Sequence, residues 1–312
     1  MKSKTDDIVK TQRETLAVFQ RVNPTRRDFS PGDPRLADLR KREETIYNNL
    51  GFPSVDFREK RILEAGCGTG DIALMLADWG ATVDAFDLNE HSVAHAQSMA
   101  KRFPNSNRCR FQQGSVFSPP YNGQYDFVQC LGVLAHVGDP KLAFKTLASR
   151  VKPGGFLYIM NLNTWGFLSR WLKRAIVSAL ALGNPERKAR WAQRLWKKHI
   201  SRAAKFGVRT EEQIAWDNFV APHKTETIGE WLEWMKECDM EYVSSYPSFY
   251  SLKLPSTSTG GIEPMPCQNA PRNLILRWLL RGLVQIRWAM ALGVGGLCSI
   301  SFVARKRPAK NP

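Results

Sequence analysis

The chain has 312 residues, of which 43% are hydrophobic and 24% charged, and its formal net charge at pH 7 is +16. The apolar content is sufficient for a buried core, and the length allows one large domain or one domain with an appendage. The six cysteines form no C-x-x-C pair and no zinc-ligand spacing, which argues against a metal centre and favours free thiols in a reducing compartment.

The two ends of the sequence indicate a protein without a membrane span. The N-terminal region lacks the apolar stretch of a secretory signal. The longest uncharged run near the C-terminus, residues 288–304, falls short of the about 20 apolar residues that a spanning helix needs. We therefore expect a soluble, cytoplasmic protein, with peripheral contact to a membrane left open.

The most informative element is a glycine-rich turn between a short apolar run and an amphipathic segment. Residues 62–70 read ILEAGCGTG. Glycine permits a positive φ and lets a ligand approach the backbone, and the helix that follows offers free N–H groups. Asp71 stands where the dinucleotide fingerprint needs its third glycine, and the sequence contains no G-x-x-x-x-G-K-S/T phosphate loop. The pattern predicts a strand, a ligand-binding turn and a helix, and it disfavours NAD.

The next predicted strand ends in an acidic residue. It covers residues 81–86 and is followed by Asp87, 21 positions after Gly66. An acid at this point can accept hydrogen bonds from both hydroxyls of a ribose. The alternative is that Asp87 only caps a helix that starts near Asn89. Further along, the sequence predicts strands at residues 109–112, 125–131 and 156–161, a helix at 141–150 and a turn at 152–155.

This order of elements resembles the class I S-adenosylmethionine-dependent methyltransferases. Glu64-x-Gly66-x-Gly68-x-Gly70 is similar to motif I of that family, and residues 126–140 resemble its D-x-V-x-x-x-x-V-L-x-H-V-x-D-P stretch, the kind found in quinone-biosynthesis and natural-product methyltransferases. The resemblance covers about residues 58–163. It implies an α/β, Rossmann-like, doubly wound seven-stranded sheet with helical insertions that form a lid, and S-adenosyl-L-methionine as cofactor without a metal.

The resemblance also assigns cofactor contacts along the ends of the first four strands. These are Glu64, Gly66, Cys67, Gly68, Gly70, Asp87, Leu88, Ser115, Val116, Cys130 and Leu131. The family usually has an acid where Ser115 stands, in contact with the adenine amino group. Either the Ser115 hydroxyl and the Val116 backbone replace that acid, or the adenine is held less tightly.

Four segments are expected. They are an N-terminal helical cover (1–57), the cofactor-binding core (58–163), a basic helical insertion on the acceptor side (164–226), and the C-terminal part of the sheet with an inserted amphipathic helix (227–312, with the helix at 273–292). In the last segment the resemblance places a helix at 227–238 and strands at 241–245 and 297–304, the late strands being antiparallel.

Positive charge gathers in the two inserted regions, with a net +11 over residues 165–209 and +8 over residues 270–312. The helix at 165–182 is predicted to carry Arg170, Arg174 and Ser178 on a face opposite an apolar one, and the helix at 273–292 carries a polar stripe that includes Arg277 and Arg281. A further helix, which starts after residues 183–185, is predicted to have an apolar face opposite a lysine- and arginine-rich one; the residues of that apolar face are Trp191, Leu195, Trp196, His199, Ala203 and Phe206. These helices form a lid with solvated charges, contact an anionic membrane surface, or bind nucleic acid, for which no recognisable module is present.

Methyl transfer needs alignment of acceptor and methyl group, exclusion of water and, for a hydroxyl acceptor, a base. His136, just after the fourth strand, is the first candidate, with packing or helix capping as its alternative; Asp217 and His223 follow. The favoured hypothesis is an O-directed methyltransferase for a small apolar or membrane-associated acceptor. The alternatives are an RNA- or protein-directed methyltransferase that docks through the basic helices, and a catalytically silent binding protein. The acceptor, the methylated atom and the oligomeric state do not follow from the sequence.

Overall fold

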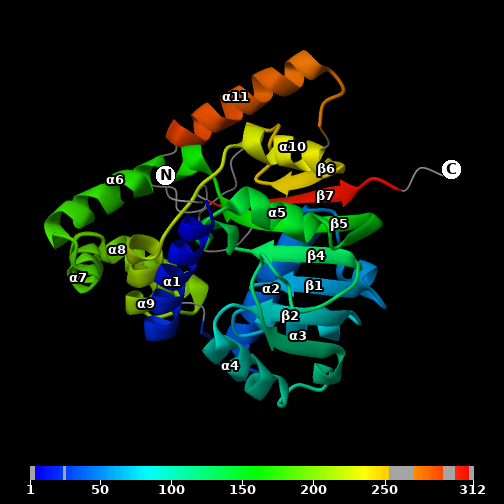
Figure 1. The fold of residues 1–312 in the computed structure, drawn as a ribbon, viewed down its shortest axis with the longest axis horizontal. Helices are drawn as coiled ribbons and strands as arrows, with labels where there is room; N and C mark the ends of the chain where they lie inside the picture. Colours follow the sequence, from blue (N-terminus) through cyan, green and yellow to red (C-terminus); the bar gives the residue numbers. More distant parts are fainter. Residues whose placement is uncertain (1–3, 24–25, 253–269, 291–298, 309–312) are drawn as a thin grey trace.

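The computed structural model describes residues 4–23, 26–252, 270–290 and 299–308. A seven-stranded sheet forms the centre, and β7 runs antiparallel to its two neighbours while the first five strands of the order are mutually parallel. The strand order is β3 (Cys109–Gln113), β2 (Thr82–Asp87), β1 (Arg61–Ala65), β4 (Tyr125–Leu131), β5 (Val151–Leu162), β7 (Ser299–Lys306) and β6 (Met240–Tyr246) (Figure 1). The predicted fold class is confirmed; residues 297 and 298 of the last predicted strand lie outside the described residues.

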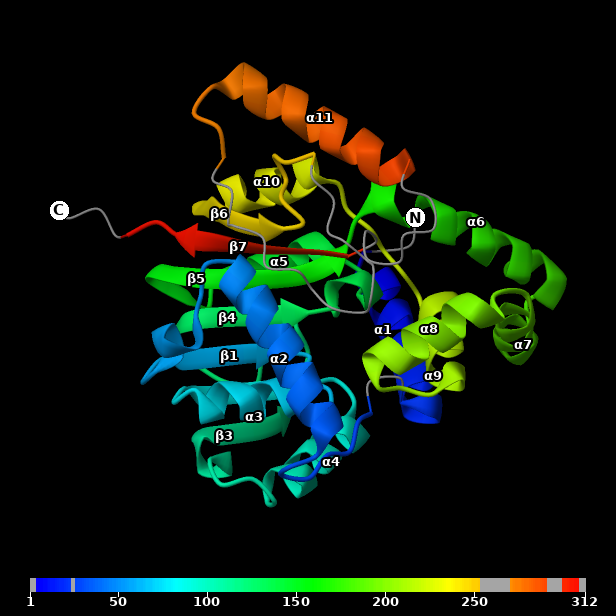
Figure 2. The ribbon, with the colours of Figure 1, turned by 180° about the vertical axis from the view of Figure 1, so that it is seen from behind.

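Helices cover both faces of this sheet, which explains why its central strands β1 and β4 are almost completely buried. One face packs against α2 (Pro34–Asn49), α3 (Asp71–Asp78) and α4 (Glu90–Ala100) (Figure 2). The other packs against α5 (Pro140–Ala148), α10 (Ile228–Glu237) and α11 (Leu274–Met290) (Figure 1). Short helical turns η1 (Ser54–Phe57), η2 (Ser106–Arg108) and η3 (Leu134–His136) join these elements.

A separate helical layer lies beyond the carboxyl ends of the parallel strands (Figure 2). It has a core of its own, centred on Val18, Val177, Ile214 and Phe219. Its elements are α1 (Lys4–Val22), α6 (Thr164–Ala181), α7 (Pro185–Leu195), α8 (Lys197–Gly207), α9 (Glu211–Ala215) and the π-helical turn η4 (Trp216–Val220). Of the N-terminal segment predicted as a cover, α1 lies in this layer, whereas α2 packs on a face of the sheet.

Two local predictions are wrong. The single helix over residues 191–206 is two helices, because Trp196 leaves the helical region with φ −118° and ψ 29°; the side chain of Phe206 lies outside the described residues. The turn at 152–155 falls inside β5, where the pairing with β4 shifts between Tyr125↔Val151 and Phe127↔Phe156 and a bulge absorbs the extra residues.

In α6 and α11, polar side chains turn toward the protein and many apolar side chains turn outward. Arg174 of α6 is only 8% exposed, whereas the apolar Trp171 and Leu172 are 41% and 65% exposed. In α11 the polar stripe turns toward the protein, and the Gln285 side chain accepts a hydrogen bond from the Ile228 amide. Large apolar side chains of α11 point outward instead, among them Ile275 and Trp278. Amphipathicity located the helices correctly but did not determine which face is buried.

Among the described residues, no helix combines the length and the apolar character that crossing a membrane requires.

Candidate active site

The glycine turn after β1 is shaped by backbone contacts to the neighbouring strand. The amides of Gly66 and Cys67 both donate to the Phe86 carbonyl at the end of β2, at 2.7 and 3.0 Å. Gly66 has φ +76°, and Gly70 takes a left-handed conformation at the start of α3. The turn therefore presents the amino end of a helix at the carboxyl edge of the sheet, as the sequence predicted.

Gly66→Ala is expected to destabilise this turn strongly. A Cβ at Gly66 would lie 2.1 Å from Cγ2 of Val133 and would occupy a positive φ, so strain and overpacking add; each costs about 1–3 kcal/mol. Urea unfolding checks the loss. Gly51 has φ +88° with no atom within 4 Å of such a Cβ, so Gly51→Ala measures the strain alone. Val133→Ala should recover part of the Gly66→Ala loss, and equal losses for the two glycine variants would refute the clash.

The Asp87 carboxylate accepts hydrogen bonds from the glycine turn and from the residue that precedes helix α4. Its Oδ2 accepts from the Gly68 amide at 2.9 Å and its Oδ1 from the Asn89 amide at 2.8 Å. Asn89 is the residue that caps α4. Burial raises the pKa of the Asp87 carboxyl, and the backbone hydrogen bonds oppose this rise. The helix cap is therefore Asn89 and not Asp87, whose carboxylate links the glycine turn to the residue that caps α4.

Glu64 is buried beneath the turn in a polar chain that reaches α2. Gln129 donates to Glu64 Oε1 at 3.0 Å, and the Tyr47 hydroxyl donates to Gln129 at 2.6 Å. Oε2 of Glu64 is buried and has no hydrogen-bond partner among the described residues. Burial, followed by the nearby Asp71 charge, raises the pKa of Glu64 to about 8. A buried acceptor without a partner suits the ammonium group of an amino-acid cofactor, so this site fits S-adenosylmethionine.

Glu64→Gln is expected to flatten the pH dependence of stability. Because the folded pKa of about 8 exceeds the ordinary glutamate value of 4.5, the folded chain holds a proton that the unfolded chain releases, and stability falls as pH rises through that window. Urea unfolding across this range should show a shallower decline for Glu64→Gln. Burial also raises the pKa of Glu226 to about 8, so Glu64→Gln/Glu226→Gln should flatten the curve further. An unchanged slope in both variants would contradict this account.

Helix α1 crosses the carboxyl edge of β2, β3 and β4. Gln12 donates to Ser115 Oγ at 2.9 Å, Thr15 donates to the His136 carbonyl at 2.8 Å, and the Phe19 carbonyl accepts from Asn89. Ser115 thus follows β3 and meets a carboxamide of α1. The remaining predicted cofactor residues lie along this edge, with Val116 and Cys130 buried, Leu131 at the end of β4 and the Leu88 carbonyl bonded to Gln113.

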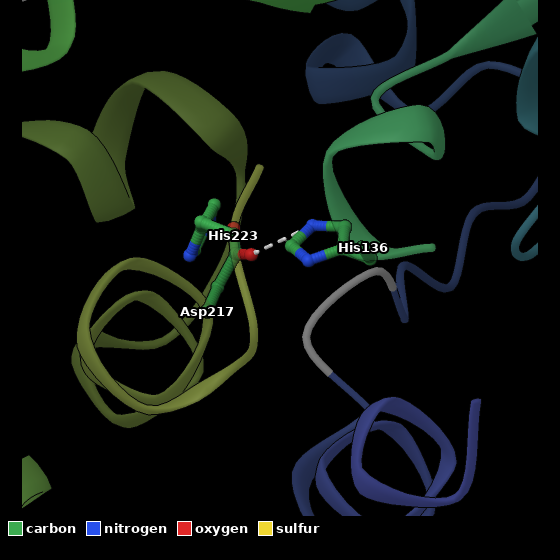
Figure 3. Close-up of side chains that lie close together, drawn as sticks. All are labelled: His136, Asp217 and His223. Atoms are coloured by element: carbon green, nitrogen blue, oxygen red, sulfur yellow. Dashed lines mark ion pairs between the residues drawn. The ribbon is translucent and has the colours of Figure 1, made fainter. Parts of the chain in front are cut away.

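His136, Asp217 and His223 come together although they are distant in sequence (Figure 3). His136 ends η3 after β4, Asp217 lies in η4, and His223 follows that turn. His136 Nε2 is 3.8 Å from Asp217 Oδ1, and the centroids of the two imidazole rings are 4.7 Å apart. One potential ligand atom from each of the three side chains lies within 4.8 Å of the others. The structure therefore groups the three side chains predicted as catalytic candidates.

Hydrogen bonds fix the tautomer of His136. Its Nδ1 lies 2.7 Å from the Pro222 carbonyl, which can only accept, so Nδ1 carries the proton and Nε2 offers a lone pair toward Asp217. Burial lowers the pKa of His136, and the Asp217 charge opposes this. For His223, burial followed by His136 and Arg174 lowers the pKa well below its usual value. His136 is neutral at physiological pH and able to accept a proton.

Two arginines that the sequence analysis did not select complete the cluster. Arg174 donates to the carbonyls of Asn218 and Ala221 at 2.7 and 2.8 Å and lies 2.9 Å from His223 Nδ1. Arg209 pairs with Asp217 Oδ2 at 2.9 Å. Arg174 had a signal in the sequence, its i,i+4 spacing with Arg170 on a basic helix, but such a pattern usually marks a solvated face; Arg209 lies between α8 and α9 and had none. With these two positive charges beside one carboxylate, the cluster disfavours a divalent cation despite its ligand-type atoms.

The fold and the glycine turn define a Rossmann-like protein that binds its ligand at the carboxyl edge of the sheet. Comparison with known families matches residues 35–214, more than half of the chain, to the family described as "Methyltransferase domain". The chain therefore belongs to the class I S-adenosylmethionine-dependent methyltransferases, and the cofactor predicted from the sequence is that of the family.

Individual relatives are more distant. An uncharacterized protein of Synechococcus sp. is 31% identical over 55% of this chain and 46% of its own length. The ubiquinone biosynthesis O-methyltransferases of Thiobacillus denitrificans and Escherichia coli are 33% and 35% identical over 33% and 38% of this chain and 45% and 49% of theirs. The chain spans about half the length of the curated relatives it matches. The solved structure of PKMT2 from Rickettsia typhi matches 90% of this chain and 53% of that one with a TM-score of 0.55 at 12% identity, a likeness of fold alone.

Proposed function

We propose that this protein transfers a methyl group from S-adenosylmethionine to a hydroxyl group of a small apolar acceptor, with His136 as general base. The observation that carries the proposal is the fixed tautomer of His136, whose Nε2 lone pair lies at the carboxyl edge of β4 beside Asp217. The names of the ubiquinone-biosynthesis relatives support an oxygen atom and an apolar acceptor.

In this proposal each group of residues has one role in methyl transfer. When bound, S-adenosylmethionine supplies a methyl group on a good leaving group. Asp87, Gly68 and the start of α3 hold the donor side. His136 Nε2 would accept the proton of the acceptor hydroxyl, and Asp217 would stabilise the resulting imidazolium. Helix α1 closes the edge of the sheet and excludes water.

The test is to incubate the purified protein with methyl-labelled S-adenosylmethionine and a host extract, and to count label in the lipid, small-molecule, RNA and protein fractions. The proposal expects label in the lipid or small-molecule fraction that is alkali-stable as an ether and lost in His136→Ala. Label in RNA or protein would overturn it in favour of a macromolecular substrate. No label despite measurable cofactor binding would favour a silent binding protein.

We further propose that the exposed apolar faces of α6 and α11 dock on an anionic membrane surface. The two helices are in contact (Figure 1). Their outward side chains are unusually apolar for a water-facing surface, with Trp278 67% and Ile275 71% exposed. Tryptophan, leucine and isoleucine on a segment rich in arginine and lysine are the composition that interfacial binding needs. This location would give the active site access to an acceptor dissolved in lipid.

Sedimentation with vesicles tests the docking surface. The wild-type chain is expected to bind vesicles that contain phosphatidylglycerol more tightly than vesicles of phosphatidylcholine. Ile275→Ser/Trp278→Ser should reduce binding by about tenfold or more, since each buried large apolar side chain contributes about 1.5–3 kcal/mol. Val55, which is 69% exposed on η1, provides the matched control as Val55→Ser. Equal binding by both variants would exclude α11 as the docking element.

A further inference from the structure

An open pocket of about 650 Å³ lies at the seam between the cofactor-binding core and the helical layer. One wall is the segment from Arg26 to Arg35, which leads from α1 to α2, and the other is formed by residues 204–213 of α8 and α9. Both walls are anchored. The Arg27 carbonyl contacts His95 on α4 at 2.9 Å, and Gln213 donates to the Asn23 carbonyl at the end of α1 at 2.9 Å.

The lining is strongly basic. It contains Arg26, Arg27, Arg35, Lys205 and Arg209, with Asp28 as its one acid. Asp28 is already paired with Arg102 outside the pocket, and this contact lowers the pKa of Asp28. The pocket is therefore lined by an excess of positive side chains, which favours the approach of an anion.

Ion pairs account for three of these cations. Arg27 pairs with Asp71 at 2.6 Å, Arg35 with Asp33 at 2.7 Å and Arg209 with Asp217 at 2.9 Å. Within the described part of the chain, neither Arg26 nor Lys205 has a carboxylate within 4.0 Å. The two remaining charges thus come from opposite walls of one cavity, and together they match a dianion.

We propose that this pocket is a binding site for a phosphate group, held between Arg26 and Lys205, and that its occupation joins the helical layer to the core. A guanidinium and an ammonium are the side chains that bind phosphate, and a phosphate monoester carries nearly two charges at neutral pH. The site is independent of the proposed methyl transfer. It touches the catalytic cluster only through Arg209, whose Asp217 partner faces His136.

Calorimetric titration at constant ionic strength tests the proposal, with inorganic phosphate and then glycerol 3-phosphate as probes. Saturable binding is expected, together with a rise in Tm, since a ligand that binds only the folded state stabilises it. Arg26→Gln/Lys205→Gln should weaken binding at least tenfold. Lys198→Gln/Arg202→Gln removes the same charge from exposed positions on α8 outside the pocket and should leave binding unchanged.

A second experiment, vesicle binding, distinguishes a lipid phosphate from a soluble phosphate ester. Vesicles with phosphatidic acid present the same group on a lipid, and Arg26→Gln/Lys205→Gln would then lose vesicle binding while the soluble phosphate esters bind weakly in every variant. Binding of soluble phosphate esters and binding of phosphatidic acid vesicles each support the site, provided that only Arg26→Gln/Lys205→Gln weakens it. Equal loss in both double variants would show non-specific attraction to net charge and overturn the proposal, as would the absence of saturable binding up to millimolar phosphate. All four residues are exposed or at the surface, so circular dichroism should show folded variants.

Discussion

His136→Ala is expected to lower kcat by about 10²–10⁴-fold while the Kd for S-adenosylmethionine changes little. This range is typical for the loss of a general base. The cofactor affinity should survive because, among the described residues, the side chain of His136 contacts Pro222, Asp217, Phe19 and His223, and none of these lies in the glycine turn. Single-turnover kinetics and equilibrium binding of the cofactor measure the two quantities separately.

The pH profile distinguishes a base from a packing residue. Burial lowers the pKa of His136 below its ordinary value of 6.5, and the proposed role as a base needs its unprotonated form. The ratio kcat/KM should therefore be flat above pH 6.5 and fall at lower pH as His136 gains a proton. The residual activity of His136→Ala should lack this acidic limb. His91→Ala, on the exposed start of α4, is the matched control and should retain both rate and profile. A normal acidic limb in His136→Ala would show that another group titrates.

The sequence defined the core of the fold because each of its elements carries a local signal. Three signals lie at fixed spacings within about a hundred residues: the glycine turn, the acid at the end of β2 and the strand before His136. The backbone geometry of strands, turns and helices determines where residues at these spacings lie. The positions of Gly66, Asp87 and His136 relative to the sheet follow directly from that pattern.

The surroundings of His136 depended on contacts that no local pattern encodes. Asp217 and His223 were selected only because they stand in the segment before α10, and their meeting with His136 requires η4 to fold against α1 and α7. Arg174 illustrates the same limit. Periodicity placed it on a polar face, yet that face is buried, because it satisfies backbone carbonyls of η4 and contacts His223.

Tertiary contacts also decide which faces of α6 and α11 are buried. An amphipathic pattern indicates only that a helix has a polar and an apolar face. In a soluble protein the apolar face normally packs against the core. Here arginine and glutamine side chains find backbone and side-chain partners inside, and apolar side chains remain at the surface. Only the tertiary structure distinguishes a helix that buries its apolar face in the core from a helix that exposes this face.

Asp87→Ala is expected to weaken binding of S-adenosylmethionine by about 100-fold or more. The carboxylate holds the amides of Gly68 and Asn89 and so fixes the turn relative to α4. Hydrogen bonds to a charged group contribute about 1.5–3 kcal/mol each, and the variant also removes the acceptor proposed for the ribose hydroxyls. Isothermal titration calorimetry with the cofactor measures the change.

Asp126→Ala is the control that makes this result specific. Asp126 accepts from the Arg61 amide at 2.8 Å and pairs with Lys152 at 3.0 Å, so its removal deletes a comparable pair of interactions at the opposite, amino-terminal edge of the sheet. Both variants should therefore lose stability to a similar extent in urea, because each breaks a carboxylate bridge between a strand and its neighbourhood. Only Asp87→Ala should lose cofactor affinity. If the two variants bound the cofactor equally well, Asp87 would only link the glycine turn to Asn89, and the ribose would have to be held elsewhere along the edge of β2.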